Sequence, residues 1–237
     1  MLVVIPTYNE AENIQPMLSA LFLLPINDLH VLIVDDNSPD GTGEIVEKLK
    51  LDNPMQIDVI HRIGKLGLGT AYITGFQFGL AHGYDFIGQM DADFSHPPEK
   101  LVELVAAVQN GIDLAIGSRY IEGGSLDKDW PIWRKFLSGF GNIYARTILN
   151  IPVKDVTGGF RVWNRNLLER MPLDKIRSNG YIFQVEMLYV ACKLSNNYKE
   201  VPFYFADRKI GKSKMSFKIQ VEAAVNVWRL PGYHKGI

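Results

Sequence analysis

The sequence predicts an α/β fold with a mainly parallel central sheet flanked by helices. Short apolar runs alternate with helical patterns through the first half of the chain, as in successive βαβ units. The first runs stop at clusters of turn-forming residues, which mark strand ends. The chain has 237 residues, 47% of them hydrophobic, and no low-complexity tract, so it should bury a proper core.

The expected elements follow one another at regular spacing. A strand at 2–5 is followed by a helix with Ile14, Leu18 and Leu21 on one face. The remaining strands are expected at 30–34, 57–60, near 86 and at 114–116, and the helices between them at 43–51, 71–81 and 99–109. From Tyr120 onward the alternation weakens and aromatic residues and glycines become more frequent, as expected where loops form a site.

Composition excludes several classes of protein. The net charge of −1 gives no overall attraction to nucleic acid. The single cysteine, Cys192, lies in an apolar stretch and excludes an internal disulfide or a multi-cysteine metal site. No run reaches the ~18 apolar residues of a membrane span. The chain begins directly on a strand without a leader pattern, so we expect a cytoplasmic protein, at most peripheral on the cytoplasmic face of a membrane.

One apolar run ends at two carboxylates, Asp91 and Asp93, just ahead of two prolines and a helical pattern. The acids are therefore expected at the carboxyl end of a strand, where open α/β sheets bind their ligands. Paired carboxylates beside a loop suit Mg²⁺ or Mn²⁺, which usually share their coordination with substrate phosphates. For this motif taken alone, a solvated acidic turn is the alternative.

Polar residues gather at other strand ends as well. Glu10, Asp36 and Asp91 each follow an apolar run by only a few residues, and together they indicate a nucleotide pocket. The glycine-rich segment 61–71 leads into a helix and suits contact with phosphate. It lacks the Gly-Lys-Ser/Thr ending of a P-loop and the dinucleotide-binding spacing, so a plain flexible connection is its alternative.

Several further segments complete a pattern that covers nearly the whole chain. The segments are VIPTYNE at 4–10, VDDNSPDGT at 34–42, KLGLGTAY at 65–72, DAD at 91–93 with PPE at 97–99, GSRY at 117–120, DVTGGFR at 155–161, GYIFQVEM at 180–187 and DRKIGKSK at 207–214. In this order they resemble the family 2 glycosyltransferases, and within them the dolichyl-phosphate (polyprenol-phosphate) mannosyltransferase branch.

The resemblance implies a GT-A (Rossmann-like) fold and inverting transfer of mannose from GDP-mannose to a dolichyl or polyprenyl phosphate. It implies catalytic roles for Asp91, Asp93, Arg208 and Lys214. It places the nucleotide sugar at Pro6, Tyr8, Glu10, Val34, Asp36, Asp91, Ala92, Arg208 and Lys214, the metal at Asp93 and Ser95, and the acceptor phosphate at Arg119, Arg134 and Ser138. Ser95 stands where some relatives carry a glutamine, so it would bind the metal directly or through water.

The implied reaction requires positive charge at two places, the leaving group and the acceptor phosphate. The nucleoside diphosphate leaving group gains negative charge, which a divalent cation and the basic loop with Arg208 and Lys214 would offset. The acceptor phosphate monoester has a second pKa of around 6 and is already largely ionised near pH 7. It can attack without a protein base and needs cationic groups such as Arg119 and Arg134. Arg134 and Ser138 are neighbours if 133–138 is helical.

Two further acids have weaker assignments. Glu186 and Gln184 occupy the region where many family 2 enzymes place a catalytic base. Since the acceptor needs no base, we expect a supporting role for Glu186, such as binding a sugar hydroxyl. Asp155 either contacts the sugar or caps the loop that follows it.

The chain is expected to divide into a catalytic domain at 1–215 and a C-terminal amphipathic helix and tail at 216–237. The helical stripe of Val221, Ala224, Val225 and Trp228 fits core packing or a membrane surface. The substrate is expected to be a lipid, and Trp228, Tyr233, His234 and Lys235 would suit an interface. A membrane surface, and a membrane-protein subunit, are therefore candidate partners.

Two other functions fit the same residues. A UDP-sugar, such as UDP-glucose, is an alternative donor for transfer to a polyprenyl phosphate. A nucleotide-binding module without turnover is the other alternative, although Asp91, Asp93, Arg208 and Lys214 are all retained. Loss of turnover on Asp93→Ala distinguishes an enzyme from such a module.

Overall fold

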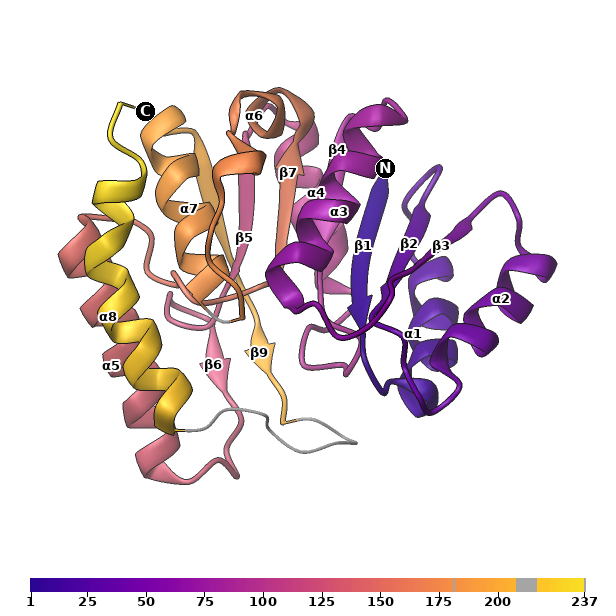
Figure 1. Ribbon diagram of the computed structural model, residues 1–237, viewed down its shortest axis with the longest axis horizontal. Coiled ribbons are helices and arrows are strands. Elements are labelled where there is room, and N and C mark those ends of the chain that lie inside the picture. The colour runs from indigo at the N-terminus through magenta and orange to yellow at the C-terminus, as the bar shows by residue number, and fades with distance from the viewer. Residues whose placement is uncertain (181, 208–216, 237) are drawn as a thin grey trace.

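The computed structural model describes residues 1–180, 182–207 and 217–236. A seven-stranded sheet in the order β3-β2-β1-β4-β7-β5-β8 forms the middle layer of this part of the chain, with helices on both faces (Figure 1). Its strands are β1 Leu2–Thr7, β2 His30–Asp35, β3 Ile57–His61, β4 Phe86–Gln89, β5 Leu114–Ser118, β7 Arg161–Asn164 and β8 Tyr198–Pro202. A separate parallel pair is formed by β6 Ser125–Leu126 and β9 Tyr204–Phe205.

The helices connect these strands. They are α1 Ala11–Phe22, α2 Thr42–Asp52, α3 Leu68–Ala81, α4 Lys100–Gln109, α5 Ile132–Leu149, α6 Arg165–Arg170, α7 Ile182–Leu194 and α8 Phe217–Tyr233, with a 3₁₀ turn at Leu173–Lys175. The long α5 and α8 lie side by side at one end of the molecule, next to α7 (Figure 1).

The expected fold class and the first half of the expected elements are confirmed. Helix α3 begins at Leu68, three residues before the expected start, and β1 and β2 each extend one or two residues further. The exception to parallel pairing is β7, which was not expected and runs antiparallel to both β4 and β5.

The direction of the strands brings many loops to one edge of the sheet. Strands β3, β2, β1 and β4 run parallel, so their carboxyl ends share that edge. Strand β5 points the same way, because β7 is antiparallel to both β4 and β5. The amino end of β7 lies at the edge too, and this brings in the segment 155–160.

Alternating side chains on the strands fill two separate cores, because both faces of the sheet are covered. Leu2 and Val4 of β1 point to the face covered by α3, α6 and α7. Val3 and Ile5 point to the opposite face, which α1, α2 and α4 cover. Helix α3 lies especially close to the sheet: a Cβ at Gly75 would collide with the side chain of Val4.

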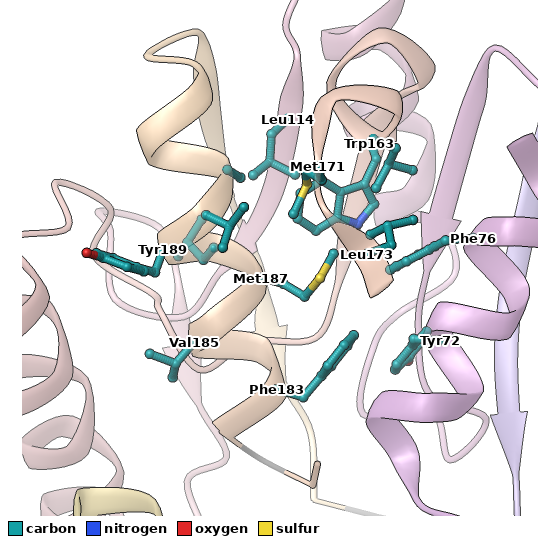
Figure 2. Close-up of a cluster of buried hydrophobic side chains, with 14 of the residues drawn as sticks. Tyr72, Phe76, Leu114, Trp163, Met171, Leu173, Phe183, Val185, Met187 and Tyr189 are labelled. Atoms are coloured by element: carbon teal, nitrogen blue, oxygen red, sulfur yellow. The ribbon is translucent and has the colours of Figure 1, made fainter. Parts of the chain in front are cut away.

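The larger core links α3 to α7 through aromatic rings (Figure 2). The rings of Tyr72 and Phe183 are parallel, with centroids 5.9 Å apart, and Phe76 meets Trp163 edge to face at 6.0 Å. Tyr72 is fully buried, and its hydroxyl reaches the carboxylate of Asp91 at the sheet edge. Core packing thus fixes one of the groups that line the candidate site.

Helix α8 packs against α5 and α7 through Val227 and Leu230, which are buried. Val225 and Trp228 are exposed, so the expected stripe does not form the packed face; the side chain of Val221 lies outside the described part of the chain. The expectation that His234 faces an interface is wrong, because its side chain is buried beside Glu186. Apolar spacing on one helix does not reveal which of its faces the rest of the fold covers.

Candidate functional site

The two acids lie directly after β4, as predicted, and their carboxylates are held by different partners. Asp91 Oδ1 accepts a hydrogen bond from the Tyr72 hydroxyl at 3.1 Å. Asp93 Oδ1 accepts from the backbone N–H of Ser95 at 3.1 Å across a tight turn, in which Phe94 adopts a φ of +61°. Burial and the nearby Asp91 carboxylate raise the pKa of Tyr72, so its hydroxyl stays protonated and donates.

His96 fixes the backbone of this acidic turn. Its Nδ1 accepts the backbone N–H of Asp91 at 3.0 Å, so that nitrogen carries no proton. The imidazole ring is buried and stacks on Phe160 with centroids 5.0 Å apart. Burial lowers the pKa of His96, against the opposing effect of the two carboxylates, and favours the neutral form that this hydrogen bond needs.

Asp93 and Ser95 offer ligands of the kind that a hard divalent cation prefers. Both are almost completely buried, and their oxygens are a carboxylate and a hydroxyl, which suit Mg²⁺ or Mn²⁺ rather than a soft metal. The described residues contain no group of three acidic, histidine or cysteine side chains that could enclose an ion alone. The residues therefore fit a cation that takes most of its ligands from a bound substrate.

The residues predicted to hold the nucleoside lie at the ends of β1 and β2. Pro6 and Val34 are partners in the β1–β2 register, and the Val34 side chain is buried in the core. The Glu10 carboxylate accepts from Asn13 at the start of α1. Lys65 lies over the ring of Tyr8, 4.1 Å from its centroid, so the glycine-rich loop reaches the β1 end.

Asp36 connects the glycine-rich loop to β2. Its carboxylate forms an ion pair with Arg62 and accepts the backbone N–H of Gly67 at 3.2 Å. Arg62 also donates to the carbonyl of Gly67 at 2.9 Å. The loop is therefore held in place by Asp36 and is no plain flexible connection. Ala92, the remaining residue assigned to the nucleotide sugar, is buried beside the acids.

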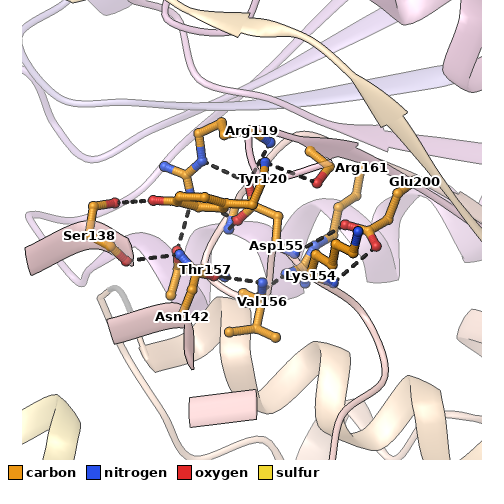
Figure 3. Close-up of polar contacts among 12 residues, drawn as sticks. Arg119, Tyr120, Ser138, Asn142, Lys154, Asp155, Val156, Thr157, Arg161 and Glu200 are labelled. Carbon is orange, nitrogen blue, oxygen red and sulfur yellow. Dashed lines mark hydrogen bonds and ion pairs between the residues drawn. The ribbon is translucent and has the colours of Figure 1, made fainter. Parts of the chain in front are cut away.

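Arg119 lies after β5 and is bound by Asp155, as Figure 3 shows. Arg119 Nε and Nη2 lie 2.7 Å from the two carboxylate oxygens, and Nη2 also donates to the Thr157 hydroxyl at 2.8 Å. Asp155 additionally accepts from the backbone N–H of Gly158, so it caps its loop. Burial alone would raise the pKa of Asp155, but the Arg119 guanidinium and these hydrogen bonds hold it below its usual range.

Tyr120 and Asn142 join this ion pair to α5. The Tyr120 hydroxyl lies 2.6 Å from Ser138 Oγ. Asn142 Oδ1 accepts from the backbone N–H of Val156 at 2.8 Å, and its Nδ2 donates to Thr157 at 3.0 Å. Ser138 and Arg119 are thereby brought into one network (Figure 3).

The third residue assigned to the acceptor phosphate, Arg134, lies one turn before Ser138 on α5. Its guanidinium stacks on the ring of Trp130, 3.7 Å from the centroid, and lies 3.4 Å from a carboxylate oxygen of Asp207. It is therefore not part of the Arg119–Asp155 network. Arg208 and Lys214, assigned to the diphosphate, lie outside the described residues.

Glu186 and Gln184 are buried and hydrogen-bonded to other residues of the fold. Glu186 is fully buried and accepts from the backbone N–H of Ser178 and from His234. Gln184 accepts from Gln89 at 2.6 Å in the core. A role for Glu186 in binding a sugar hydroxyl would require these partners to leave.

Sequence reasoning gave no role to several residues that shape the site: Arg62, Tyr72, His96, Tyr120 and Asn142. Tyr72 and Tyr120 lie in the quoted segments KLGLGTAY and GSRY, and His96 lies three residues after Asp93. The nearness of these polar side chains to the motifs is the sequence signal that could have identified them. For Asn142 the sequence offers none, because its partners lie 14 and 15 residues further on.

Residues 2–171 match the family model described as glycosyl transferase family 2. The chain belongs to glycosyltransferase family 2. In this family 2 enzyme the matched segment includes both acids, the glycine-rich loop, Arg119 and the strand β7.

Similar curated proteins cover almost the whole chain. It is 43% identical to a polyprenol monophosphomannose synthase of Mycolicibacterium smegmatis, over 98% of this chain and 87% of the relative. It is 44% identical to an undecaprenyl-phosphate mannosyltransferase of Micrococcus luteus, over 100% of this chain and 96% of the relative. It is 38% identical to a dolichol-phosphate mannosyltransferase of Pyrococcus furiosus, over 96% of this chain and 62% of the relative.

Solved structures share the fold at low sequence identity. A glucosyl-3-phosphoglycerate synthase from Mycobacterium tuberculosis, in complex with uridine diphosphate, superposes with a TM-score of 0.66 at 17% identity, over 98% of this chain and 79% of that one. A mannosyltransferase from Pyrobaculum calidifontis, in complex with GDP-mannose and Mn²⁺, has a TM-score of 0.61 at 16% identity, over 100% and 64%. The family 2 enzyme thus has the expected GT-A fold.

Proposed function

We propose that this enzyme transfers mannose from GDP-mannose to a polyprenyl or dolichyl phosphate, with inversion at the anomeric carbon. The main observation that supports this proposal is that two sets of charged residues lie at the same edge of the sheet. Asp91 and Asp93 follow β4, and the Arg119–Asp155 network follows β5 and precedes β7. The names of three relatives, all polyprenyl- or dolichol-phosphate mannosyltransferases, support the choice of sugar and acceptor.

On this proposal, Asp93 and Ser95 bind a divalent cation, and the donor binds next to this cation. A bound Mg²⁺ or Mn²⁺ supplies Lewis-acid stabilisation of the diphosphate leaving group. Tyr72 orients the Asp91 carboxylate and His96 holds the Asp91 backbone, so both keep Asp91 in a fixed position. The nucleoside is assigned to Pro6, Tyr8, Glu10, Val34 and Asp36. The diphosphate is assigned to Arg208 and Lys214, which lie outside the described residues.

The acceptor side needs positive charge and no general base. A phosphate monoester is mostly ionised near pH 7, with a second pKa around 6. Arg119, Arg134 and Ser138 supply cationic and hydroxyl groups for it, and α5 carries two of the three. The buried, hydrogen-bonded state of Glu186 agrees with a reaction in which no carboxylate deprotonates the acceptor.

Because the proposed acceptor is a lipid, we infer that α5 lies at a membrane surface. Five apolar side chains on α5 are more than half exposed: Ile132, Trp133, Phe136, Phe140 and Ile143. Trp228 of the adjacent α8 is 65% exposed and donates to Tyr144 of α5, so the two helices present aromatic groups together. No helix in the described part of the chain is long and apolar enough to cross a bilayer. We infer peripheral attachment through this pair of helices, on the cytoplasmic face of a membrane, with a membrane-protein subunit as a further candidate partner.

The test supplies purified protein with a short polyprenyl phosphate, Mn²⁺ or Mg²⁺, and either GDP-mannose or UDP-glucose, and follows the lipid product by mass. We expect a mannosyl lipid from GDP-mannose, loss of product with EDTA, and a fall in turnover of at least ~100-fold for Asp93→Ala. Asp174→Ala, which removes an exposed acid of the 3₁₀ turn Leu173–Lys175, is the matched control.

Product from UDP-glucose alone would retain the reaction class and refute mannose as the sugar. Unchanged turnover in Asp93→Ala would refute the metal assignment. Absence of product from both donors, with tight nucleotide binding retained, would indicate a binding module or a missing partner.

A further inference from the structure

Glu186 and His234 form a buried pair that joins the C-terminal helix to the rest of the enzyme. Glu186 lies on α7, His234 directly follows α8, and both side chains are 0% exposed. His234 Nε2 lies 2.7 Å from Glu186 Oε1 and donates to it, because a carboxylate only accepts. The reaction proposed above uses neither side chain.

The same carboxylate also holds the segment that precedes α7. Glu186 Oε2 accepts the backbone N–H of Ser178 at 2.7 Å and that of Arg177 at 3.2 Å. The Arg177 guanidinium lies 5.0 Å from the ring centroid of Tyr233, at the end of α8. Residues 177–178 are thus held by the C-terminal helix both through Glu186 and through an aromatic contact.

The next residue, Asn179, binds the glycine-rich loop. Its Oδ1 accepts the backbone N–H of Gly69 at 3.1 Å, and its Nδ2 donates to a carbonyl of the same loop at 3.0 Å. A Cβ on Gly69 would lie only 2.8 Å from the carbonyl oxygen of Ser178, so the two backbones are in direct contact. Through Gly67 the loop reaches the Asp36 carboxylate.

We propose that His234 is a positioning residue for the donor nucleotide. Through Glu186 it holds residues 177–179, and through them it keeps the glycine-rich loop in place beside Asp36. Docking of α8 and binding of the nucleotide are then coupled, and the coupling is reciprocal. The identity of the nucleotide rests on the proposed function; the coupling itself rests on the contacts above.

The experiment compares four proteins: wild type, His234→Ala, His234→Gln and Tyr144→Phe. Hydrogen–deuterium exchange of 62–70 and 174–180 reports the loop directly, and calorimetry gives the affinity for GDP with Mn²⁺. Tyr144→Phe is the matched control, because the Tyr144 hydroxyl contacts α8 at the carbonyl of Ala224 (3.1 Å) and at Trp228 Nε1 (2.8 Å) without touching Glu186.

We expect His234→Ala to accelerate exchange in both segments and to raise the Kd for GDP about tenfold. His234→Gln retains a donor for the carboxylate and should recover most of the affinity. Tyr144→Phe should stay within about twofold of wild type. In the wild type, GDP should slow exchange at the end of α8, because the coupling is reciprocal.

The proposal is overturned if folded His234→Ala keeps wild-type exchange and affinity, or if Tyr144→Phe causes equal losses. If His234→Ala does not fold, two other measurements test the proposal: the affinity of His234→Gln for GDP, and the effect of GDP on exchange at the end of α8 in the wild type. A wild type that binds no GDP refutes the proposed donor, while the exchange of 62–70 in the variants still tests the coupling.

Discussion

Arg119 and Asp155 show how a single residue pair can support a site while being hidden from solvent. The Arg119 side chain is 9% exposed and that of Asp155 is 0% exposed, so the Asp155 carboxylate is withdrawn from solvent and the Arg119 guanidinium largely so. Removing one member of such a pair leaves the other buried without compensation, which is more damaging than replacing both. The pair also fixes Thr157, and through Asn142 it reaches α5.

Asp155→Asn should therefore lower the free energy of unfolding by about 3–5 kcal/mol at pH 7, measured by urea denaturation. The exposed Asp174→Asn is the control and should change it by less than about 0.5 kcal/mol. A loss in Asp155→Asn no larger than that of the control would show that the buried charge of Arg119 is compensated by other groups.

The same pair predicts a dependence of stability on pH. The pKa of Asp155 is lower in the folded than in the unfolded chain, so its stabilisation is complete above the unfolded value of about 3.9. It is lost as the pH falls through the lower, folded pKa. Wild type should lose stability below about pH 4 more steeply than Asp155→Asn, as measured by thermal unfolding at pH 7, 4 and 3. Parallel curves for the two proteins would contradict this.

At the level of single residues, the sequence predicted what is decided locally. Asp91 and Asp93 follow an apolar run and precede two prolines, so their place after a strand could be predicted. Their partners could not, because the contacts of Tyr72 with Asp91 and of Arg119 with Asp155 span 19 and 36 residues. Glu186 was assigned to sugar binding for the same reason: its motif is visible, but its burial is a property of the whole fold.

Among the elements, the loop between β3 and α3 is held in a conformation that requires glycine. Gly67 has φ +101° and ψ 158°, a region that is essentially restricted to glycine, and a Cβ there would also collide with Asn179. Gly64, in the same loop, has no atom within 4 Å of its Cβ position. The two glycines therefore have opposite tolerances to substitution.

Gly67→Ala should destabilise the enzyme by about 2–3 kcal/mol and weaken binding of GDP, while Gly64→Ala should leave both nearly unchanged. Chemical denaturation and calorimetry measure the two effects. Equal behaviour of the two variants would mean that the loop rearranges easily and that Asn179 does not constrain it.

Elements up to Ser118 could be predicted because each combines a clear hydrophobic period with a turn signal. Strand β7 could not, since its sequence RVWN has a charged and a polar residue at its ends and only two apolar residues between them. Its direction is set by β4 and β5 on either side. For α8, apolar spacing indicated a stripe, but the packed face is the one with Val227 and Leu230. Which face is covered depends on the position of α5 and α7, which the sequence of α8 does not contain.

For the whole molecule, the exposed apolar face of α5 predicts how the enzyme meets its lipid. Changing Trp133, Phe136 and Phe140 to Ser should lower binding to anionic phospholipid vesicles by about 100-fold or more, because each ring loses its burial in the interface. Binding of GDP should stay within about twofold of wild type. Vesicle sedimentation and calorimetry give the two quantities.

The matched control removes three other exposed apolar side chains, Leu23, Leu51 and Met55, from helices or loops at the opposite end of the sheet. It should bind vesicles like the wild type. If both triple variants lose vesicle binding equally, attachment depends on general hydrophobicity and α5 is not the membrane-facing element.

The central position of β7 has a consequence for how the chain is made. Strands β1 to β4 have all left the ribosome once residue 89 is free, but the open side of β4 finds its partner only with residues 161–164. Strand β5, although synthesised earlier than β7, cannot close that side, because β7 lies between them. At synthesis rates of about 5–20 residues per second, the β4 edge remains unpaired for roughly 4–15 s. Nascent chains of this enzyme therefore have an exposed strand edge that is prone to aggregation. A chaperone that binds this edge would protect the chain until β7 pairs with β4.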